Sequence, residues 1–584
     1  MHKYLALFFF VFYFTLSANA QSNKIDSHLQ DLLSTSQTTQ ECLISFYSDF
    51  TIEVDENLEK PEKTSIVFSM LNHNADKSQK EAKALLNSFD IHYKTFVVAN
   101  CIYAKLDEDI VNQLAKLEDV KMIAYNPSVM LEEPMLVDDI DLREPEPEWG
   151  IKMINADSVW NLGYRGEGVV IAGQDTGYDW DNDVLINKYR GYDAINQTAD
   201  HNYNWHDAIS EINPLHMDTI VTDTTNPCGL NLIIPCDDNN HGTHTMGTMV
   251  GSDTLNAIGV APNSKWIACR NMERGYGTPA TYLECFEWFL APTDLNGENP
   301  DPSKAPHVIN NSWSCPEMEG CNAANWSILE EAVNNLKSAG VVVVVSAGNS
   351  GPNCNTVSTP AAIFKNSFTV GATAANDTIA RFSSRGTVSV DSSFRLKPNV
   401  SAPGVAVRSC IRNNEYRSFN GTSMAGPHVA GAVALIISAN PNLAGKVEVI
   451  ESILESTSVA KTDTLNCDGI SGMDVPNPVY GFGRIDVLAA VEQALLYSSV
   501  QDLPGANPFT LYPNPTSNKI SIAFNERTSA RIQLFSYDGK LLSTDSLTTA
   551  FNLDLVLLGM PAGIYFIRVE QEGNNYIEKF VKVD

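Results

Sequence analysis

Short, continuous apolar runs bounded by glycine and polar residues mark the central part of the chain. Residues 169–172 read Val-Val-Ile-Ala between two glycines, and residues 341–345 are five consecutive valines. Runs of this kind are typical of parallel strands that are covered by helices on both faces. Because sites in open parallel α/β sheets lie at the carboxyl ends of the strands, we expect functional residues directly after these runs.

Three polar segments carry the candidate chemistry. Gly-Gln-Asp-Thr-Gly at residues 173–177 closes the first run, and Asn-His-Gly-Thr-His at residues 240–244 opens a helix-like stretch. Asn-Gly-Thr-Ser-Met-Ala-Gly-Pro-His at residues 420–428 leads into an apolar segment, so a small hydroxyl side chain stands where a buried helix begins. In chain order, the three segments supply an acid, a base and a nucleophile.

Asp175, His241 and Ser423 fit these three roles. A serine hydroxyl attacks a carbonyl only if a neighbouring imidazole takes its proton, and a carboxylate must hold that imidazole in the correct tautomer and orientation. The three residues are far apart along the chain. The hypothesis therefore requires a fold that brings them into one cleft.

Over roughly residues 149–496 the chain resembles the subtilisin-like serine peptidases of the subtilase family. The resemblance implies a mainly parallel α/β sheet with flanking helices, in a peptidase domain spanning residues 149–498. It also implies that Asn349 supplies the oxyanion-hole side chain, together with the backbone N–H of Ser423. By the same resemblance, an extended substrate is clamped between two segments. The residues of this expected substrate-binding clamp are Gly275, Tyr276, Gly277, Ser312, Trp313 and Ser314.

The specificity pocket departs from the family pattern at Ser314 and Ser358, where the family commonly has glycine. No acidic residue obviously lines this pocket. We therefore expect an apolar or aromatic residue before the cut. The chemistry needs no cofactor, but the resemblance allows a structural calcium ion whose ligands the sequence does not identify.

Other chemistries compete for the same residues. The Asp-Thr-Gly triplet at Asp175 is similar to the active-site turn of aspartic peptidases, but those need a second carboxylate and no other such triplet ends a strand. His241 and His244 could be imagined as zinc ligands, but a His-Glu-x-x-His arrangement and a third ligand are missing. We expect His244 and His428 to be packed structural histidines.

Three alternating carboxylates follow the candidate catalytic aspartate, at Asp179, Asp181 and Asp183. Oxygen-rich loops can hold calcium, although this one lacks the glycine and the distal glutamate of an EF-hand loop. A solvated acidic loop is the favoured interpretation, and calcium remains the alternative.

The N-terminus indicates the compartment. Lys3 precedes an apolar run that ends in Ala-Asn-Ala at residues 18–20, which is typical of a secretory signal peptide spanning residues 1–20. The run is too short for a membrane span, and no later segment is predicted to cross a membrane. The next residue, Gln21, is not cysteine, so a lipid anchor is not indicated.

Residues 41–127 form a small unit of their own. Strands are predicted at residues 43–46, 66–70, 96–103 and 120–124, with amphipathic helices between them. The pattern resembles the propeptide of subtilases, which implies a folding aid and an intramolecular inhibitor; a generic α/β domain is the alternative. Residues 128–148 are rich in Glu, Asp and Pro, and are interpreted as an acidic linker where maturation occurs.

The last segment, residues 507–584, has alternating apolar positions and an Asp-Gly hairpin signal at residues 538–539. Short strands with turns favour a β-sandwich. Leu-Tyr-Pro-Asn-Pro at residues 511–515 and the Lys-Phe-Val-Lys-Val-Asp terminus resemble the sorting domain of type IX secretion substrates. That resemblance implies outer-membrane secretion machinery as a partner and a Gram-negative bacterium as the source. An accessory β domain that binds substrate or glycan is the alternative.

Charge and cysteine content agree with an extracellular protein. The formal net charge of −31 argues against nucleic acid as a partner, because phosphates require basic residues. Eleven cysteines fit an oxidising compartment. Among the nine from Cys228 to Cys467 one must stay unpaired, and the short separations favour Cys228 with Cys236 and Cys315 with Cys321.

The sequence therefore favours a secreted serine endopeptidase that hydrolyses peptide bonds of extended protein or peptide substrates through an acyl-enzyme on Ser423. The competing hypothesis is an inactive subtilase-like module that serves in adhesion or binding.

Overall fold

The computed structural model of the 584-residue chain describes residues 24–36, 38–48, 50–137, 146–216, 226–497, 509–536, 540–571 and 574–583. Contacts divide the chain into two compact units, residues 1–497 and 498–584. Each is described separately. The proposed signal peptide, residues 1–20, lies outside the described residues.

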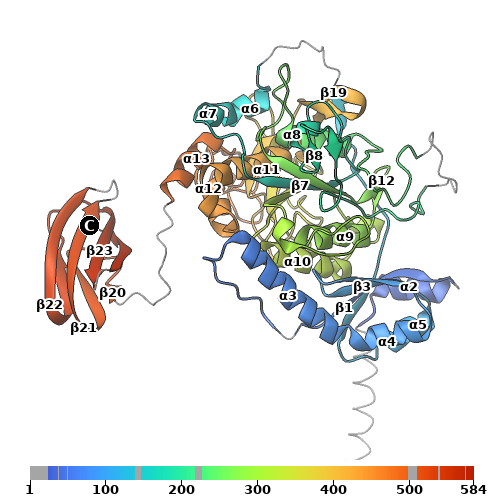
Figure 1. Cartoon of the computed structure of the whole chain (residues 1–584), viewed down its shortest axis with the longest axis horizontal. Helices are drawn as coiled ribbons and strands as arrows, with labels where there is room; N and C mark the ends of the chain where they lie inside the picture. Colours follow the sequence, from blue (N-terminus) through green and yellow to red (C-terminus); the bar gives the residue numbers. More distant parts are fainter. Residues whose placement is uncertain are drawn as a thin grey trace, which may run out of the picture. The chain divides into compact units, whose positions relative to one another are not determined.

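A seven-stranded parallel sheet forms the centre of the first unit (Figure 1). Its strands run in the order β10-β11-β7-β14-β15-β16-β17. They are β10 (Trp205–Asp207), β11 (Lys265–Arg270), β7 (Val170–Asp175), β14 (Val308–Asn311), β15 (Val342–Ser346), β16 (Phe368–Thr373) and β17 (Val400–Pro403). Every residue of β15 is buried, as the run of valines predicted. The predicted fold class is confirmed.

Helices cover both faces of this sheet. Val342 and Val344 pack into one apolar core with α8 (His241–Val250), α11 (Thr422–Ala439), α12 (Val447–Ser456) and α13 (Val487–Leu496). Val343 and Val345 pack into a second core, with α9 (Pro279–Leu290) and α10 (Ala323–Ser338). Successive side chains of a strand point to opposite faces, so the valine run serves both cores.

Among the described residues, α11 is the one helix long and apolar enough to cross a membrane by length and composition. The sequence analysis expected no such segment after the N-terminus. However, 89% of the 18-residue helix is buried inside the unit. It is the core helix of the sheet, which explains an apolar surface on every side.

Smaller elements complete the part of this unit that carries the candidate catalytic residues, residues 146–497, which is called the catalytic part below. They are α6 (Trp149–Met153), α7 (Ala156–Asn161), and the short strands β8 (Tyr192–Asp193), β9 (Thr198–Ala199), β12 (Met272–Glu273), β13 (Tyr276–Gly277), β18 (Val407–Ile411) and β19 (Glu415–Asn420).

The N-terminal part builds a separate four-stranded antiparallel sheet in the order β2-β3-β1-β4. Its strands are β1 (Gln40–Phe46), β2 (Tyr93–Phe96), β3 (Cys101–Leu106) and β4 (Val120–Tyr125). The helices α2 (Ser27–Thr35), α4 (Lys80–Ser88) and α5 (Glu108–Leu114) pack on it around their own core. Because α2 shares this core, the unit includes residues before position 41.

Two predictions for this region are wrong. Residues 66–70 were predicted as a strand but lie inside α3 (Lys60–Ser78), where Val67 and Leu71 are buried one turn apart. A short apolar run fits either structure, and contact with the catalytic part selects the helix. Residues 96–103 were predicted as one strand, but Asn100, with φ of 42°, belongs to the turn between β2 and β3.

The second unit is antiparallel throughout. Its strands are β20 (Phe509–Tyr512), β21 (Lys519–Ser536), β22 (Leu541–Val556), β23 (Gly563–Gln571) and β24 (Asn574–Lys582). Alternating residues such as Ile520, Ile522, Ile567 and Val569 enclose one apolar core, consistent with the predicted β-sandwich. The Asp-Gly pair at residues 538–539 lies outside the described residues, but β21 and β22 on either side of it pair as a hairpin.

Four disulfides link cysteines of the catalytic part. The local pairs Cys228–Cys236 and Cys315–Cys321 confirm the sequence prediction. Cys269–Cys285 and Cys354–Cys467 join residues too distant in sequence to be inferred from spacing. Cys410 is the unpaired thiol of the nine, while Cys42 and Cys101 are also free.

We predict that removing Cys354–Cys467 destabilises the protein more than removing Cys228–Cys236. The first closes a loop of 113 residues and the second a loop of 8. The loop-entropy model assigns them about 5 and about 2.5 kcal/mol, respectively. The double variants Cys354→Ser/Cys467→Ser and Cys228→Ser/Cys236→Ser serve as each other's control in denaturant unfolding. Equal losses would contradict the prediction.

Candidate active site

Asp175 and His241 form a buried hydrogen-bonded pair. Asp175 is the last residue of β7, and His241 is the first residue of α8. The Nδ1 atom of His241 lies 2.8 Å from Oδ1 and 2.9 Å from Oδ2 of Asp175, and both residues are almost completely buried. Gly242 permits this approach, since a Cβ atom there would lie 2.1 Å from the Gly177 carbonyl oxygen.

The environment of His241 controls its protonation. Burial works against a charged imidazole, but the charge and the hydrogen bond of the Asp175 carboxylate favour it, and the charges of Glu133 and Asp237 add to this effect. The net pKa of His241 is therefore raised above its ordinary value of 6.5. The other ring nitrogen, Nε2, is buried and has no hydrogen-bond partner among the described residues. It is the nitrogen free to accept a proton from a hydroxyl group.

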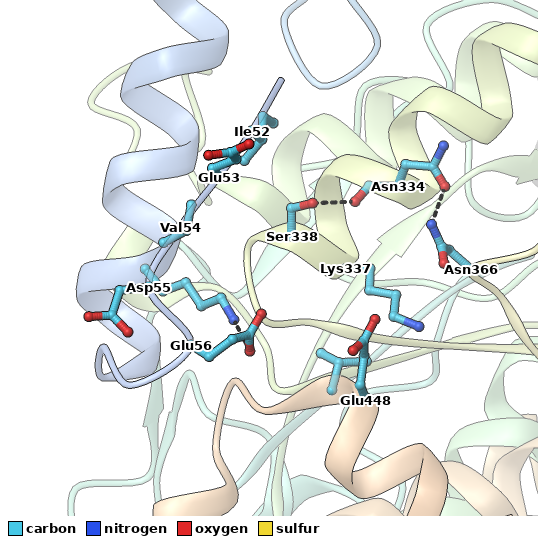
Figure 2. Close-up of a pocket in the computed structure, with 12 residues that line it drawn as sticks. Ile52, Glu53, Val54, Asp55, Glu56, Asn334, Lys337, Ser338, Asn366 and Glu448 are labelled. Atoms are coloured by element: carbon cyan, nitrogen blue, oxygen red, sulfur yellow. Dashed lines mark hydrogen bonds and ion pairs between the residues drawn. The ribbon is translucent and has the colours of Figure 1, made fainter. Parts of the chain in front are cut away.

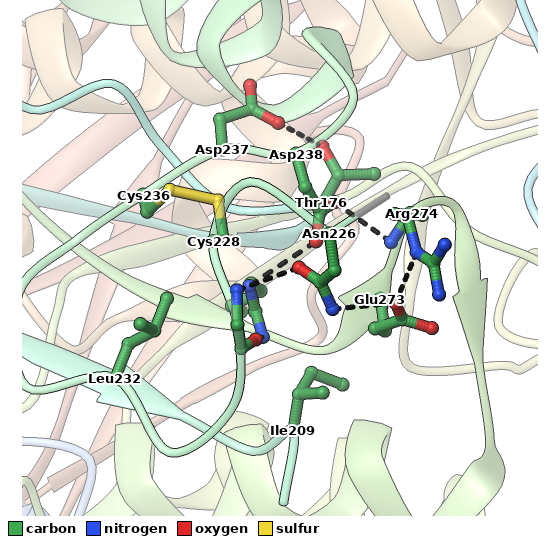
Figure 3. A network of polar contacts seen from close by, with 12 residues as sticks. Thr176, Ile209, Asn226, Cys228, Leu232, Cys236, Asp237, Asp238, Glu273 and Arg274 are labelled. Atoms are coloured by element: carbon green, nitrogen blue, oxygen red, sulfur yellow. Dashed lines mark hydrogen bonds and ion pairs between the residues drawn. A yellow bond between two sulfur atoms is a disulfide. The ribbon is translucent and has the colours of Figure 1, made fainter. Parts of the chain in front are cut away.

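A polar network, which the sequence analysis missed, fixes the loop that carries His241 (Figure 3). The Asp237 carboxylate accepts hydrogen bonds from the hydroxyls of Thr176, at 2.9 Å, and Thr243, at 2.6 Å. The neighbouring Asp238 carboxylate pairs with the buried Arg270 guanidinium at 3.3 Å. Thr176 follows Asp175 in the chain and Arg270 lies beside Asp175 on β11, so both carboxylates tie the His241 loop to the Asp175 strand.

Ser423 lies in the first turn of α11, next to Asn349. The side-chain oxygen of Asn349 accepts hydrogen bonds from the backbone N–H of Thr422, at 2.8 Å, and from its hydroxyl, at 3.0 Å. This fixes the amide so that its Nδ2 faces away from Thr422. The carbonyl oxygen of Ser423 accepts from the hydroxyl of Ser312 at 3.4 Å. Asn349 and the N-terminus of α11 are therefore adjacent, as an oxyanion site requires.

The acidic linker lies across this site as an extended strand. β5 (Val129–Met130) pairs antiparallel with β13, with Tyr276 opposite Met130 and Gly277 opposite Val129. The backbone N–H of Leu131 donates to the carbonyl of Gly275 at 2.7 Å. The predicted substrate-binding residues at 275–277 thus already hold an extended segment of the same chain.

Glu132 and Glu133 follow on this strand and contact both halves of the site. The Nδ2 of Asn349 donates to the carboxylate of Glu132 at 3.2 Å. Asn239 lies two residues before His241, and its Nδ2 donates to the carboxylate of Glu133 at 2.8 Å. The backbone between these two glutamates therefore passes between the candidate oxyanion residue and the histidine loop.

Beyond the glutamates the linker pairs with a second edge. β6 (Met135–Val137) is antiparallel to β19, with Asn420 opposite Met135 and Ser418 opposite Val137. β19 ends three residues before Ser423. This second ladder could not be predicted from the sequence, because nothing in the composition of the linker identifies β19 as its partner.

The other half of the predicted clamp does not pair with the linker, so its substrate-binding role stays a prediction. Among the described strands β5 pairs with β13 alone, and Ser312, Trp313 and Ser314 do not form a ladder with it. The Trp313 ring stacks on the ring of Tyr282 with centroids 4.0 Å apart. Val129 and Leu131 belong to the same apolar core, so this aromatic pair helps to enclose the linker side chains.

His244 and His428 are packed structural residues, as predicted. The Nε2 of His244 faces the carbonyls of Val407 and Arg417, both at 3.1 Å, and burial lowers its pKa to about 3. The Nδ1 of His428 faces the carbonyl of Met424 at 2.9 Å, and burial lowers its pKa to about 4. Since His241 is bonded to Asp175 and His244 to carbonyls, the two do not form a zinc pair.

The acidic loop does not gather its carboxylates. The Asp179 carboxylate accepts from the backbone N–H of Asn413 at 2.9 Å. Within the described ranges, no three His, Cys, Asp or Glu side chains come together as a metal site would need. A structural calcium ion therefore stays a prediction without assigned ligands.

Comparison with known proteins identifies the fold and its motifs. The model of the Subtilase family matches residues 166–483, which is more than half of the chain. This chain belongs to the subtilase family. A second model, the Secretion system C-terminal sorting domain, matches residues 510–583 and indicates a secreted or cell-surface protein.

Several relatives are subtilases from bacilli. Bacillopeptidase F of Bacillus subtilis (strain 168) is 34% identical over 454 residues, covering 74% of this chain but 29% of the relative. Subtilisin DY of Bacillus licheniformis is 36% identical over 260 residues, covering 44% of this chain and 79% of the relative. Subtilisin E of Bacillus subtilis (strain 168) is 28% identical over 404 residues, covering 68% of this chain and 82% of the relative. The chain thus spans less than a third of Bacillopeptidase F.

We predict that the pKa of His241 is raised above its ordinary value and that Asp175→Asn lowers it. The variant removes the carboxylate that favours the imidazolium while burial, which opposes it, remains. Histidine NMR signals of the Ser423→Ala protein followed against pH would measure both values. His244, with its pKa of about 3, should stay neutral throughout and is the internal control. An unshifted titration in the variant would contradict the assignment.

Proposed function

We propose that this subtilase is a secreted serine endopeptidase that is made as a self-inhibited precursor. One observation supports this above all others. The acidic linker runs as a substrate-like strand along β13, and its two glutamates contact Asn349 and the loop that carries the buried His241–Asp175 pair. A binding module would not need a buried imidazole that is held by a carboxylate at one nitrogen and has no partner at the other.

In the proposed reaction, the Nε2 of His241 takes the proton of Ser423 as its hydroxyl attacks the substrate carbonyl. Asp175 holds the imidazole through Nδ1 and stabilises the imidazolium that forms. The Nδ2 of Asn349 and the backbone N–H of Ser423 stabilise the developing negative oxygen. The same imidazole then protonates the leaving amine, and water hydrolyses the acyl-enzyme on Ser423.

The proposed maturation cut lies between Glu132 and Glu133. Residues 129–132 would then be the non-primed side of the substrate, with Leu131 second and Val129 fourth before the cut. Both side chains are buried, at 3% and 0% exposure, whereas Met130 between them is 51% exposed. The cleft is therefore proposed to select aliphatic residues at the second and fourth positions before the cut.

The residue directly before this cut is Glu132, and not the apolar or aromatic residue expected from the sequence. We propose that the primary pocket accepts glutamate, and that the second and fourth positions contribute more to selectivity. A peptide-library profile of the matured enzyme tests both statements at once.

The remaining parts of the chain fit this role. The N-terminal α/β unit is proposed to act as intramolecular inhibitor and folding aid until the linker is cut. The C-terminal sorting domain is proposed to engage outer-membrane secretion machinery of a Gram-negative bacterium, and to be removed on export. No cofactor is required for the proposed chemistry.

We predict that Ser423→Ala abolishes casein hydrolysis and stops self-processing at Glu132–Glu133. The variant removes the nucleophile but keeps the fold. Casein assays and N-terminal sequencing measure these two consequences. A fluorophosphonate probe should label the wild-type protein but not the variant. The competing binding module predicts that wild-type protein also fails to label and stays uncut.

Asn349→Leu should lower kcat by about 10²–10³ with little change in KM, because it removes one oxyanion donor.

A further prediction concerns the C-terminal unit. Deletion of residues 507–584 should leave the catalytic part folded, since the two units have separate cores. Export to the medium of the native host should be lost, which immunoblotting of cell and medium fractions would measure. Normal export of the truncated protein, or an intact C-terminus on the free exported protein, would disfavour the sorting role.

A further inference from the structure

The N-terminal α/β unit and the acidic linker together form the pro-region, residues 24–148. It contains a second segment with the same residue order as the strand in the cleft. Residues 129–133 read Val-Met-Leu-Glu-Glu, and residues 52–56 read Ile-Glu-Val-Asp-Glu. Both place branched aliphatic residues at the positions that would be fourth and second before a cut, then an acidic residue, then glutamate. In the whole sequence an acidic residue followed by glutamate occurs at four places, and only these two have Val, Ile or Leu at both aliphatic positions.

The second segment has the conformation that a protease cleft accepts. Residues 50–55 belong to no helix and to no strand. Ile52 and Val54 are half-buried, while Glu53, Asp55 and Glu56 are exposed, which is the alternation of an extended chain. Because its backbone has no ladder partner, this segment can add to an edge strand such as β13.

The packing around this segment is loose (Figure 2). Residues 52–56 line a cavity of about 530 Å³, on whose other side lie Asn334, Lys337 and Ser338 of α10 and Glu448 of α12. The contacts that hold Asp55 and Glu56 are local. The backbone N–H of Asn57 donates to the Asp55 carboxylate at 2.9 Å, and Glu56 pairs with Lys63 at 3.2 Å. Few bonds must break for the segment to leave this surface.

We propose that the Asp55–Glu56 bond is a second processing site, cut by another, matured molecule of the same enzyme. The proposal rests on the proposed function and on the cut at Glu132–Glu133. Hydrolysis adds the hydroxyl of water to the carbonyl carbon of Asp55 and a proton to the amide nitrogen of Glu56, so no other reactant is needed. A second molecule is required because the cleft of the first holds its own linker, while residues 52–56 lie on α10 and α12.

The position of this bond gives the cut a consequence. It joins β1, a central strand of the pro-region sheet, to α3, which anchors the pro-region on the catalytic part. Lys60 and Lys63 donate to the carbonyls of Ala305, at 2.9 Å, and Gly445, at 3.2 Å. Thr64 donates to the carbonyl of Ala339 at 2.8 Å. After the cut, α2 and β1 are no longer joined directly to α3, although α3 stays joined through α4 to β2, β3 and β4. The sheet loses the covalent link that holds one of its two central strands to the anchor, so the inhibitor dissociates more readily.

A third stretch serves as a natural control. Residues 104–108, Ala-Lys-Leu-Asp-Glu, contain the same acidic pair but are held in the fold. Leu106 is fully buried in β3, and the Asp107 carboxylate caps α5 by accepting from the backbone N–H of Ile110. This bond should resist cleavage as long as the pro-region is folded.

The test uses the full-length Ser423→Ala precursor as substrate and a trace of matured wild-type enzyme as protease. In this substrate we expect a new N-terminus at Glu56 and none at Glu108, by mass spectrometry over time. The Glu133 terminus is expected in the wild-type precursor, whose own Ser423 faces that bond. In the Ser423→Ala substrate, Val54→Asp should slow the appearance of the Glu56 terminus by about tenfold or more, since a carboxylate would have to enter an apolar subsite. Glu53→Gln, at the exposed position, is the matched control and should change nothing.

A second measurement follows activation itself. In the active precursor, Val54→Asp should lengthen the lag before casein hydrolysis, and that lag should shorten as protein concentration rises. Equal melting temperatures of the Ser423→Ala protein with and without Val54→Asp would show that folding is unaffected. A Glu133 terminus without a Glu56 terminus, or no effect of Val54→Asp on the Glu56 terminus, overturns this inference and leaves the proposed function intact. Absence of both termini together with no casein hydrolysis would instead overturn the proposed function.

Discussion

The close packing of α11 against the parallel sheet is the constraint on which the site depends. Every residue from Thr422 to Ile437 is buried, and two glycines let the helix approach its neighbours. A Cβ atom on Gly426 would lie 2.8 Å from the side-chain oxygen of Asn310, and one on Gly431 would lie 2.5 Å from Val260. Because interiors are densely packed, a helix held this closely cannot shift, and Ser423 in its first turn cannot shift either.

The same sheet positions the partners of that serine. β7 ends at Asp175, β14 leads to Ser312, and β15 leads to Asn349, so three neighbouring parallel strands deliver polar groups to one edge. Only His241 comes from outside the sheet. Its loop is held by the carboxylates of Asp237 and Asp238, which explains why a residue 66 positions from Asp175 meets it at hydrogen-bond distance.

Local patterns predicted the parts of the structure that local physics determines. The apolar runs at β7 and β15 indicated buried parallel strands, and the short cysteine spacings indicated two disulfides. Cys354 and Cys467 could not be paired in advance, because their proximity results from the whole fold. The Ile-Val-Phe run at residues 66–68 was wrongly predicted as a strand, since the contacts that make it a helix come from a distant part of the chain. The position of the linker in the cleft could not be predicted from the sequence either, because its partners, β13 and β19, lie more than 140 residues away along the chain.

The strength of the proposed self-inhibition must come mainly from outside the cleft. The β5–β13 ladder comprises two residue pairs and one further hydrogen bond, and each hydrogen bond contributes only about 1 kcal/mol net. Docking of the pro-region adds contacts elsewhere, such as Lys94 with Glu284, at 2.8 Å, and the Val98 N–H with Glu287, at 2.8 Å. A short substrate-like strand is therefore held at high effective concentration by a separate interface. Cutting the linker removes the covalent tether but not that interface, so release of activity depends on how long the docked pro-region survives intact.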